Sequence, residues 1–306
     1  VPSTYTLTFD SSGAFIDTPD LYCDGGDTAT LTGQSEAANR DFGLTKIYDG
    51  WIQVTDGDVY AAGAITDAIP PSQSCNGQCK PIFNLDGTGG DPGVVQYGAS
   101  ADFGDGSVSS KSWLTKTNYD GKRYGFEFWR THVDLSSNAA SDWTSNQLLN
   151  ADKPTGAPIH ANVYYANGDM NIANTSWQIA SGQKIVVLVR GNLTIKSRID
   201  VASGGFLMLA VSGDIKIDSS VNSEDGVSAV EGIYIADGTV DTGNATTKLI
   251  LEGTFVGWQG VALNRDFKTA RNNSEPVEVI NYRPDFLTSA PDYISRPSLV
   301  WEEVAP

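Results

Sequence analysis

Hydrophobic and polar residues alternate in short segments along most of the chain, and this period of two is the pattern of half-buried β-strands. The second half adds a repeat. The five-residue phrase Gly-polar-apolar-polar-Ile begins at Gly168, Gly191 and Gly213, and looser copies begin at Gly232 and Gly253, so successive copies start 19 to 23 residues apart. A period near 20 residues is typical of a β-solenoid, in which stacked coils bury a core that no single coil could close.

Between these phrases lie nearly continuous aliphatic segments, which is the pattern of strands covered on both faces. They are Lys184–Val189, Phe206–Val211 and residues 249–251. Helical character is confined to residues 137–150. We therefore predict an all-β protein with a β-solenoid fold, and evenly spaced hairpins of an antiparallel sandwich are the alternative.

The repeat phrase also begins at Gly57, directly after the alternating segment 51–54, whereas the region that follows is rich in loops. We expect the solenoid to begin at Trp51, to be interrupted by an inserted β-rich, loop-rich domain, and to resume near Val163. The predicted divisions are an N-terminal strand and cap segment 1–50, a first coil 51–69, the insertion 70–160, solenoid repeats 161–275, and a proline-punctuated C-terminal strap 276–306 packed on the solenoid surface.

Composition and charge narrow the possible partners. The 306 residues include 32 glycines and 13 prolines, and 37 acidic residues against 20 basic ones give a net charge of -17. Nucleic-acid binding depends on Lys and Arg neutralising phosphates, so we expect no nucleic-acid partner. The longest apolar runs fall far short of the roughly 20 residues of a membrane-spanning helix, so we expect no transmembrane segment.

The chain begins at Val1 and Pro2, without an initiator Met or an apolar leader. We expect that a leader or anchor has been removed, or that the chain is an ectodomain, and a recombinant fragment would begin in the same way. The expected location is extracellular, at the cell surface.

Three cysteines bear on this location. Cys75 and Cys79 flank an Asn-Gly pair that can turn sharply, so we predict a small disulfide loop formed in an oxidising compartment. A zinc site would need four ligands, and His132 and His160 are not spaced near this loop. Cys23 is then either a buried thiol or a half-cystine for another chain.

Acidic, glycine-rich loops are the candidate metal sites. Carboxylates on short flexible turns suit calcium, the one cofactor that we expect. No loop matches an EF-hand, and Asp-Gly is also a common turn dipeptide, so plain turns remain the alternative. The candidate ligands are Asp24, Asp27, Asp86, Asp91, Asp102 and Asp105.

Neither an enzyme nor a sugar-binding surface has a specific signature. The chain lacks the Gly-x-Ser-x-Gly and His-Glu-x-x-His motifs, and with 37 acidic residues some carboxylate pair must lie close together, so we expect no enzyme. Aromatic residues of the insertion could stack on glycans. Residues 124–129 alternate like a strand, however, which places Phe126 and Phe128 together in a core. The aromatic residues considered are Trp113, Tyr119, Tyr124, Phe126, Phe128, Trp129 and Trp143.

The N-terminal segment has a strand pattern of its own, with Tyr5, Leu7 and Phe9 alternating with threonines, and a second alternating piece follows at 29–32. It could cap an open solenoid end, or it could be donated to a neighbouring subunit. We therefore take Tyr5, Leu7 and Phe9 as the candidate assembly residues.

A family resemblance follows from the phrases that begin at Gly191 and Gly213, from residues 253–258 and 263–266, and from the ending 301–306. They resemble secreted, pilus-associated β-solenoid surface proteins of small-genome bacteria, which are themselves uncharacterised. The repeats more distantly resemble polymer-forming β-solenoids of the bactofilin type. The resemblance covers residues 51–61 and 163–306, and it implies a β-helical surface or appendage protein with no catalytic residues to transfer.

These observations predict an extracellular structural protein, a filament-like or pilus-like subunit that self-associates into a homopolymer through strand or solenoid-end contacts. An adhesin that binds glycans is the alternative. A polysaccharide-degrading β-helix enzyme is the third possibility.

Overall fold

The computed structural model describes residues 5–8, 21–23, 28–31, 44–46, 51–66, 83–84, 93–102, 113–117, 121–133, 162–173, 176–273 and 275–295. The chain forms two compact units, Val1–Asp49 and Gly50–Pro306. In chain order the elements are β1 (Tyr5–Thr8), β2 (Leu21–Cys23), β3 (Thr28–Leu31), β4 (Leu44–Lys46), β5 (Ile52–Thr55), β6 (Val59–Ala61), β7 (Ile65–Thr66), β8 (Phe83–Asn84), β9 (Val94–Tyr97), β10 (Ala101–Asp102), β11 (Trp113–Lys116), α2 (Phe126–His132), β12 (Val163–Ala166), β13 (Met170–Ile172), β14 (Trp177–Ile179), β15 (Lys184–Val189), β16 (Leu193–Ile195), β17 (Ile199–Val201), β18 (Phe206–Val211), β19 (Ile215–Ile217), β20 (Val230–Ala236), β21 (Thr239–Asp241), β22 (Leu249–Gly257), β23 (Gly260–Ala262), the 3-10 helix η3 (Ala270–Asn273), β24 (Glu278–Asn281), α4 (Asp285–Ser289) and α5 (Asp292–Ser295).

The described part of the first unit consists of two small antiparallel sheets. β1 pairs with β3, with Tyr5 opposite Leu31, and β2 pairs with β4, with Cys23 opposite Leu44. The predicted strand at 5–9 and the alternating piece at 29–32 are therefore partners in one sheet.

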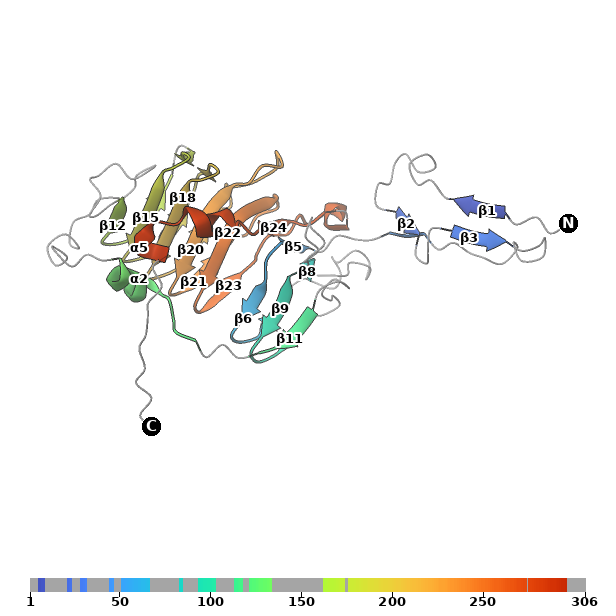
Figure 1. Cartoon of the computed structure of the whole chain (residues 1–306), viewed down its shortest axis with the longest axis horizontal. Coiled ribbons are helices and arrows are strands. Elements are labelled where there is room, and N and C mark those ends of the chain that lie inside the picture. The colour runs from blue at the N-terminus through green and yellow to red at the C-terminus, as the bar shows by residue number, and fades with distance from the viewer. Residues whose placement is uncertain are drawn as a thin grey trace. The chain divides into compact units, whose positions relative to one another are not determined.

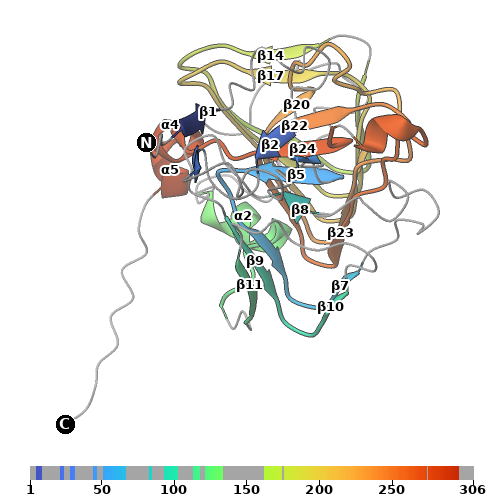
Figure 2. The same cartoon turned by 90° about the vertical axis from the view of Figure 1, so that its right-hand side faces the viewer.

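The second unit is a parallel β-solenoid, which confirms the predicted fold (Figure 1). Its main sheet has the strand order β12-β15-β18-β20-β22-β24-β5-β8, and a second sheet has the order β13-β16-β19-β21-β23. A third side of the coils is formed by β14 and β17, which lie next to each other in Figure 2.

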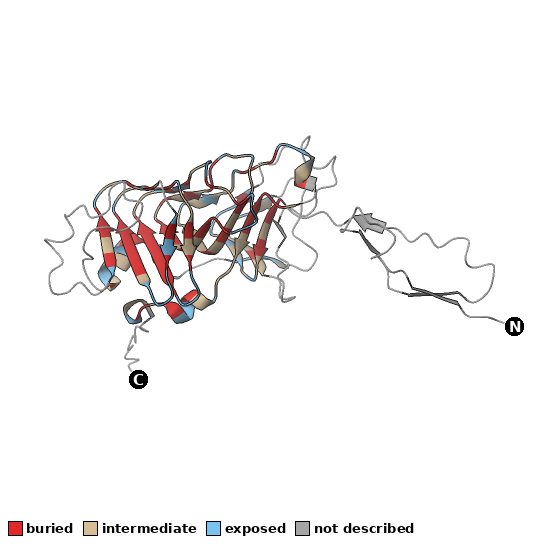
Figure 3. Cartoon of the chain, turned by 90° about the horizontal axis from the view of Figure 1, so that it is seen from above, coloured by how far each residue is buried: buried red, intermediate tan, exposed pale blue. Residues whose placement is uncertain are grey.

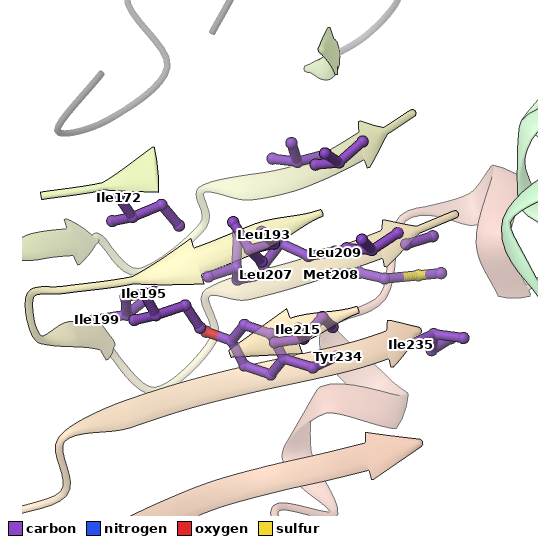
Figure 4. Close-up of a cluster of buried hydrophobic side chains, with 14 of the residues drawn as sticks. Ile172, Leu193, Ile195, Ile199, Leu207, Met208, Leu209, Ile215, Tyr234 and Ile235 are labelled. Carbon is purple, nitrogen blue, oxygen red and sulfur yellow. The ribbon is translucent and has the colours of Figure 1, made fainter. Parts of the chain in front are cut away.

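Parallel strands in register place like residues in columns along the core. Leu193 lies opposite Ile215 (Figure 4), and Ile195 lies opposite Ile217. Each of these side chains is at most 1% exposed. Burial of such columns supplies most of the stabilisation of a stacked coil. In Figure 3 the buried residues follow the stacked strands of the solenoid.

The continuous aliphatic segments form strands of the main sheet, as predicted. β15 and β18 have the predicted bounds, and all six residues of β18 are buried. They are covered on the core face by the second sheet and on the other face by α2, which packs on both strands, and by α4, whose Phe286 packs edge-on against Phe206.

Two of the predicted repeat copies were aligned wrongly. The phrases from Gly168, Gly191 and Gly213 lead into β13, β16 and β19 of the second sheet, but Gly232 and Gly253 lie opposite each other in β20 and β22 of the main sheet. The continuation of the second sheet is instead β21 and β23. The misalignment arose because both sheets contribute one alternating strand per coil and therefore share the same period.

The stacking order also differs from the prediction. The coil that begins at Trp51 does not lead into β12; its strand β5 lies against β24, at the opposite end of the repeats. The described strands of the predicted insertion continue this coil outwards, because β8 pairs with β5, β9 with β6, and β10 with β7, all in parallel. The second unit thus begins with β5 in the middle of the stack and adds β8 on one side of it, whereas the coils from β12 to β24 lead back to β5 from the opposite end.

Two local predictions were wrong. Residues 126–132 form the helix α2 rather than a strand, and the helical period separates Phe126, which is 1% exposed, from the half-buried Phe128. The predicted C-terminal surface strap contributes β24 to the main sheet before it forms α4 and α5. No helix among the described residues is long and apolar enough to cross a membrane.

Candidate functional site

The joint between β24 and β5 is the most distinctive contact of the solenoid, because it stacks two coils that are not consecutive in the chain. Glu278 lies opposite Ile52 and Asn281 lies opposite Thr55 in an in-register parallel ladder. Backbone bonds frame the ladder: the Val277 N–H donates to the Trp51 carbonyl, and the Tyr282 N–H donates to the Thr55 carbonyl, both at 2.9 Å. We name this contact the coil joint.

Apolar side chains fill the coil joint. Trp51 and Val54 are at most 5% exposed and form a small core with Val95, and Ile280 of β24 packs both on this cluster and on the main core. The coil joint therefore has the same ingredients as the contact between consecutive coils, namely a backbone ladder and a buried apolar column.

A carboxyl group is buried at this joint. Glu278 occupies the core column of Leu249 and Ile52 and is 1% exposed. Among the described residues neither carboxylate oxygen has a partner of good hydrogen-bond geometry, and Thr242 and the Arg265 backbone make only loose contacts with it. Burial raises the pKa of Glu278 to about 7, and the nearby Thr242 and Arg265 offset only part of that effect. Two nearby charges change the pKa of Glu278 in opposite directions: the Arg265 guanidinium lowers it, and the Asp241 carboxylate raises it.

Arg265 shares the buried region with Glu278. It is 3% exposed, and its guanidinium donates to the carbonyls of Thr242 at 3.0 Å, Asp218 at 3.3 Å and Thr247 at 3.4 Å. Within the described part of the chain, backbone carbonyls rather than a paired carboxylate thus satisfy the arginine. Desolvation lowers the pKa of Arg265 from its ordinary value, while the Glu278 carboxyl acts in the opposite direction.

A ladder of Asp and Asn side chains explains the second residue of the repeat phrase. The Asn192 N–H donates to Asp169 Oδ1 at 2.7 Å, the Asp214 N–H donates to Asn192 Oδ1 at 2.9 Å, and the Thr239 N–H donates to Asp214 Oδ1 at 2.7 Å. Each side chain therefore caps a backbone donor of the next coil. The same bond joins the two N-terminal coils, where the Val94 N–H donates to Asp58 Oδ1 at 2.9 Å.

The neutral Asn192 separates the carboxylates of Asp169 and Asp214 in this ladder. We expect Asn192→Asp to lower the free energy of unfolding by about 1 kcal/mol, because it places a third carboxylate in the stack, and about 1 M salt should remove much of this loss. Asn192→Ala should cost a similar amount through the lost bonds, about 1 kcal/mol, with no salt dependence. Urea denaturation at low and high salt measures both; a salt-independent loss in Asn192→Asp would contradict the electrostatic explanation.

An ion cluster holds the C-terminal segment on the solenoid. Arg283 lies 2.7 Å from Asp285, 3.1 Å from Glu252 and 3.2 Å from Glu231, and its side chain is 18% exposed. Glu231 and Glu252 lie opposite each other in β20 and β22. Burial, followed by the Glu252 charge, raises the pKa of Glu231, whereas the bond from Arg283 lowers the pKa of Asp285. All three carboxylates are bound to one guanidinium, which therefore joins the segment after β24 to β20 and β22.

The aromatic side chains of the α2 region form a cluster whose rings pack mainly against other side chains of the protein. Phe128 stacks on His132 at 5.1 Å and carries Lys122 at 4.8 Å from its ring centre, and Arg123 lies 5.5 Å from the ring of Trp258. A sugar platform needs open ring faces, and these faces are occupied by cations or a second ring. Glycan binding by this region stays a prediction that the cluster does not favour.

Most of the predicted site residues lie outside the described part of the chain. These are Phe9, Asp24, Asp27, Cys75, Cys79, Asp86, Asp91 and Asp105. Asp102 is the last, exposed residue of β10, and Tyr5 and Leu7 lie in β1. Among the described residues no group of three or more His, Cys, Asp or Glu could hold a metal ion. The calcium loops and the disulfide therefore stay predictions.

Comparison with known proteins adds no assignment. No protein-family model, curated protein or solved structure matches this chain.

Proposed function

We propose that this protein is an extracellular structural protein, a subunit of a cell-surface or appendage assembly that self-associates through strand or coil contacts. The observation that carries the proposal is the coil joint. There, one end of a finished stack of coils accepts a coil from a distant part of the chain through an in-register ladder and a buried apolar column. A contact of this kind between two copies of the chain would join them in the same way.

The first unit supports the same proposal. Its strands are arranged in two separate two-stranded antiparallel sheets. Two-stranded sheets of this size are marginally stable in water, and they gain stability when they pair with further strands. A surface assembly supplies such strands from the neighbouring subunit.

The proposal predicts concentration-dependent association that depends on the N-terminal strand. Sedimentation velocity of the full chain should show species larger than a monomer, and deletion of residues 1–9 should abolish or strongly weaken them while the circular dichroism of the solenoid is retained. A chain that remains monomeric over a wide range of concentration and ionic strength would overturn the structural role.

A further inference from the structure

Among the described strands, the second sheet of the solenoid is one strand short. The main sheet is continuous through β22, β24 and β5, but the chain leaves the stack at Tyr282, directly after β24. The second sheet therefore ends at β23, and a separate three-stranded sheet begins at β6 (Figure 1). The coil of β24 has no strand of its own between β23 and β6 among the described residues.

No described strand continues the core column of the second sheet beyond β23. Met170, Leu193, Ile215 and Val240 follow one another in register, and each is at most 1% exposed. The next residue in this column is Val261 of β23, which is 46% exposed. An apolar residue in a core column is exposed in this way when the coil that would cover it is missing.

The other side of the break shows the same loss of burial. In β13 and β16 the two core-facing residues are fully buried, whereas the corresponding Val59 and Ala61 of β6 are only half-buried. Leu263, which follows β23, is half-buried as well, although it also packs on the small core that contains Trp51 and Val54.

We propose that the edge of β23 accepts an extended strand, and that this strand is β1 of a second copy of the chain. The proposal rests on the proposed structural function and names its contact site. An incoming parallel strand would satisfy backbone groups of β23, cover Val261 and Leu263, and restore the second sheet between β23 and β6.

The sequence of β1 fits this position. The core strands of the second sheet have the pattern apolar-polar-apolar, as in Leu193-Thr194-Ile195, and Tyr5-Thr6-Leu7 has the same pattern, with threonine at the outward position. Residues 1–9 contain no charged side chain, so this segment can enter a chain of net charge -17 without repulsion between carboxylates. Separating β1 from β3 should cost little free energy, because together they form a sheet of only two strands.

Disulfide trapping between two variants tests the proposal. In a background with Cys23, Cys75 and Cys79 replaced by serine, a Val261→Cys chain is mixed with a Tyr5→Cys or Leu7→Cys chain and oxidised. Neighbouring strands lie about 4.8 Å apart, within the range of a disulfide, so a covalent dimer is expected for at least one donor position. Thr6→Cys is the matched control, since it lies on the opposite face of the same strand and should give at least about fivefold less dimer.

A second variant gives an independent result. Val261→Glu should reduce the associated fraction at least about tenfold, because a charge would be buried in the covered site. Leu287→Glu, at a 67% exposed position on α4, should leave association unchanged.

If the unmodified chain associates but Val261→Glu associates equally well and no dimer is trapped, the acceptor site is wrong and the structural function stands. If a single chain that carries both Val261→Cys and Leu7→Cys forms an intramolecular disulfide, and the mixed variants form no dimer, the strand comes from the same chain and not from a second copy. A chain that never associates would overturn both proposals.

Discussion

Replacing Glu278 with glutamine should stabilise the protein more strongly as the pH rises. The folded-state pKa of Glu278 is about 7, above its ordinary value of 4.5. The carboxyl therefore contributes stability that is fully present below pH 4.5 and is lost as the pH rises through 7. Glu278→Gln removes this loss. The change in unfolding free energy caused by the substitution should be about 2 to 3 kcal/mol more favourable at about pH 8 than at about pH 5.

Chemical denaturation of both chains at the two pH values measures this difference, and the comparison removes the contributions of all other carboxyl groups that the two chains share. Glu127→Gln is the control. It lies in an exposed pair with Arg130 and should change the stability by less than about 0.5 kcal/mol at either pH. An effect of Glu278→Gln that is equal at both pH values would show that Glu278 is ionised or exposed in the folded protein.

Replacing Arg283 with alanine should destabilise the solenoid by about 3 kcal/mol near neutral pH, because it leaves the stacked, half-buried carboxylates of Glu231 and Glu252 without their shared cation. The loss should shrink as the pH falls. Burial and the Glu252 charge raise the pKa of Glu231, so this group takes up a proton early in the acid titration and the repulsion disappears.

The Arg283→Ala loss should be partly rescued by Glu231→Gln, which removes one of the two like charges. In contrast, Arg130→Ala breaks an exposed pair and should cost less than about 0.5 kcal/mol. Urea denaturation of the two single variants and the double variant forms a mutant cycle. A double variant as unstable as the sum of its parts would contradict the electrostatic origin of the loss.

The sequence alone was sufficient for the coil architecture. Alternation within the phrases from Gly191 and Gly213, together with their period, predicted the stacked coils of a β-solenoid, and the continuous aliphatic segments predicted β15 and β18 with their observed bounds. These features are local, and each depends only on which face of one strand is buried.

The stacking order could not be predicted in this way. Pairing between β24 and β5 joins residues more than 200 positions apart, and nothing in either strand specifies its neighbour in the stack. The helix α2 was missed because residues 124–129 fit a period of two as well, although Phe126, Trp129 and Val133 also have helical spacing. A helical interpretation would have required knowing which of these side chains meets the core.

Two of the polar sites did have a signal in the sequence. Glu231 and Glu252 are separated by 21 residues, about one coil, which is the spacing of residues stacked in neighbouring coils, and Arg283 is the cation that such a pair requires. Glu278 is a charged residue beside the apolar Val277, Val279 and Ile280 in a buried strand. Their significance depends on the register, which only the structure supplies.

Electron microscopy of the purified chain tests the central claim, that this solenoid is an assembling structural subunit. We predict filaments or a regular lattice in millimolar calcium, with loss of that order in chelator if the acidic loops bind the ion; order that persists in chelator would remove the calcium role alone. Dispersed particles of single-chain size in both conditions would contradict the account.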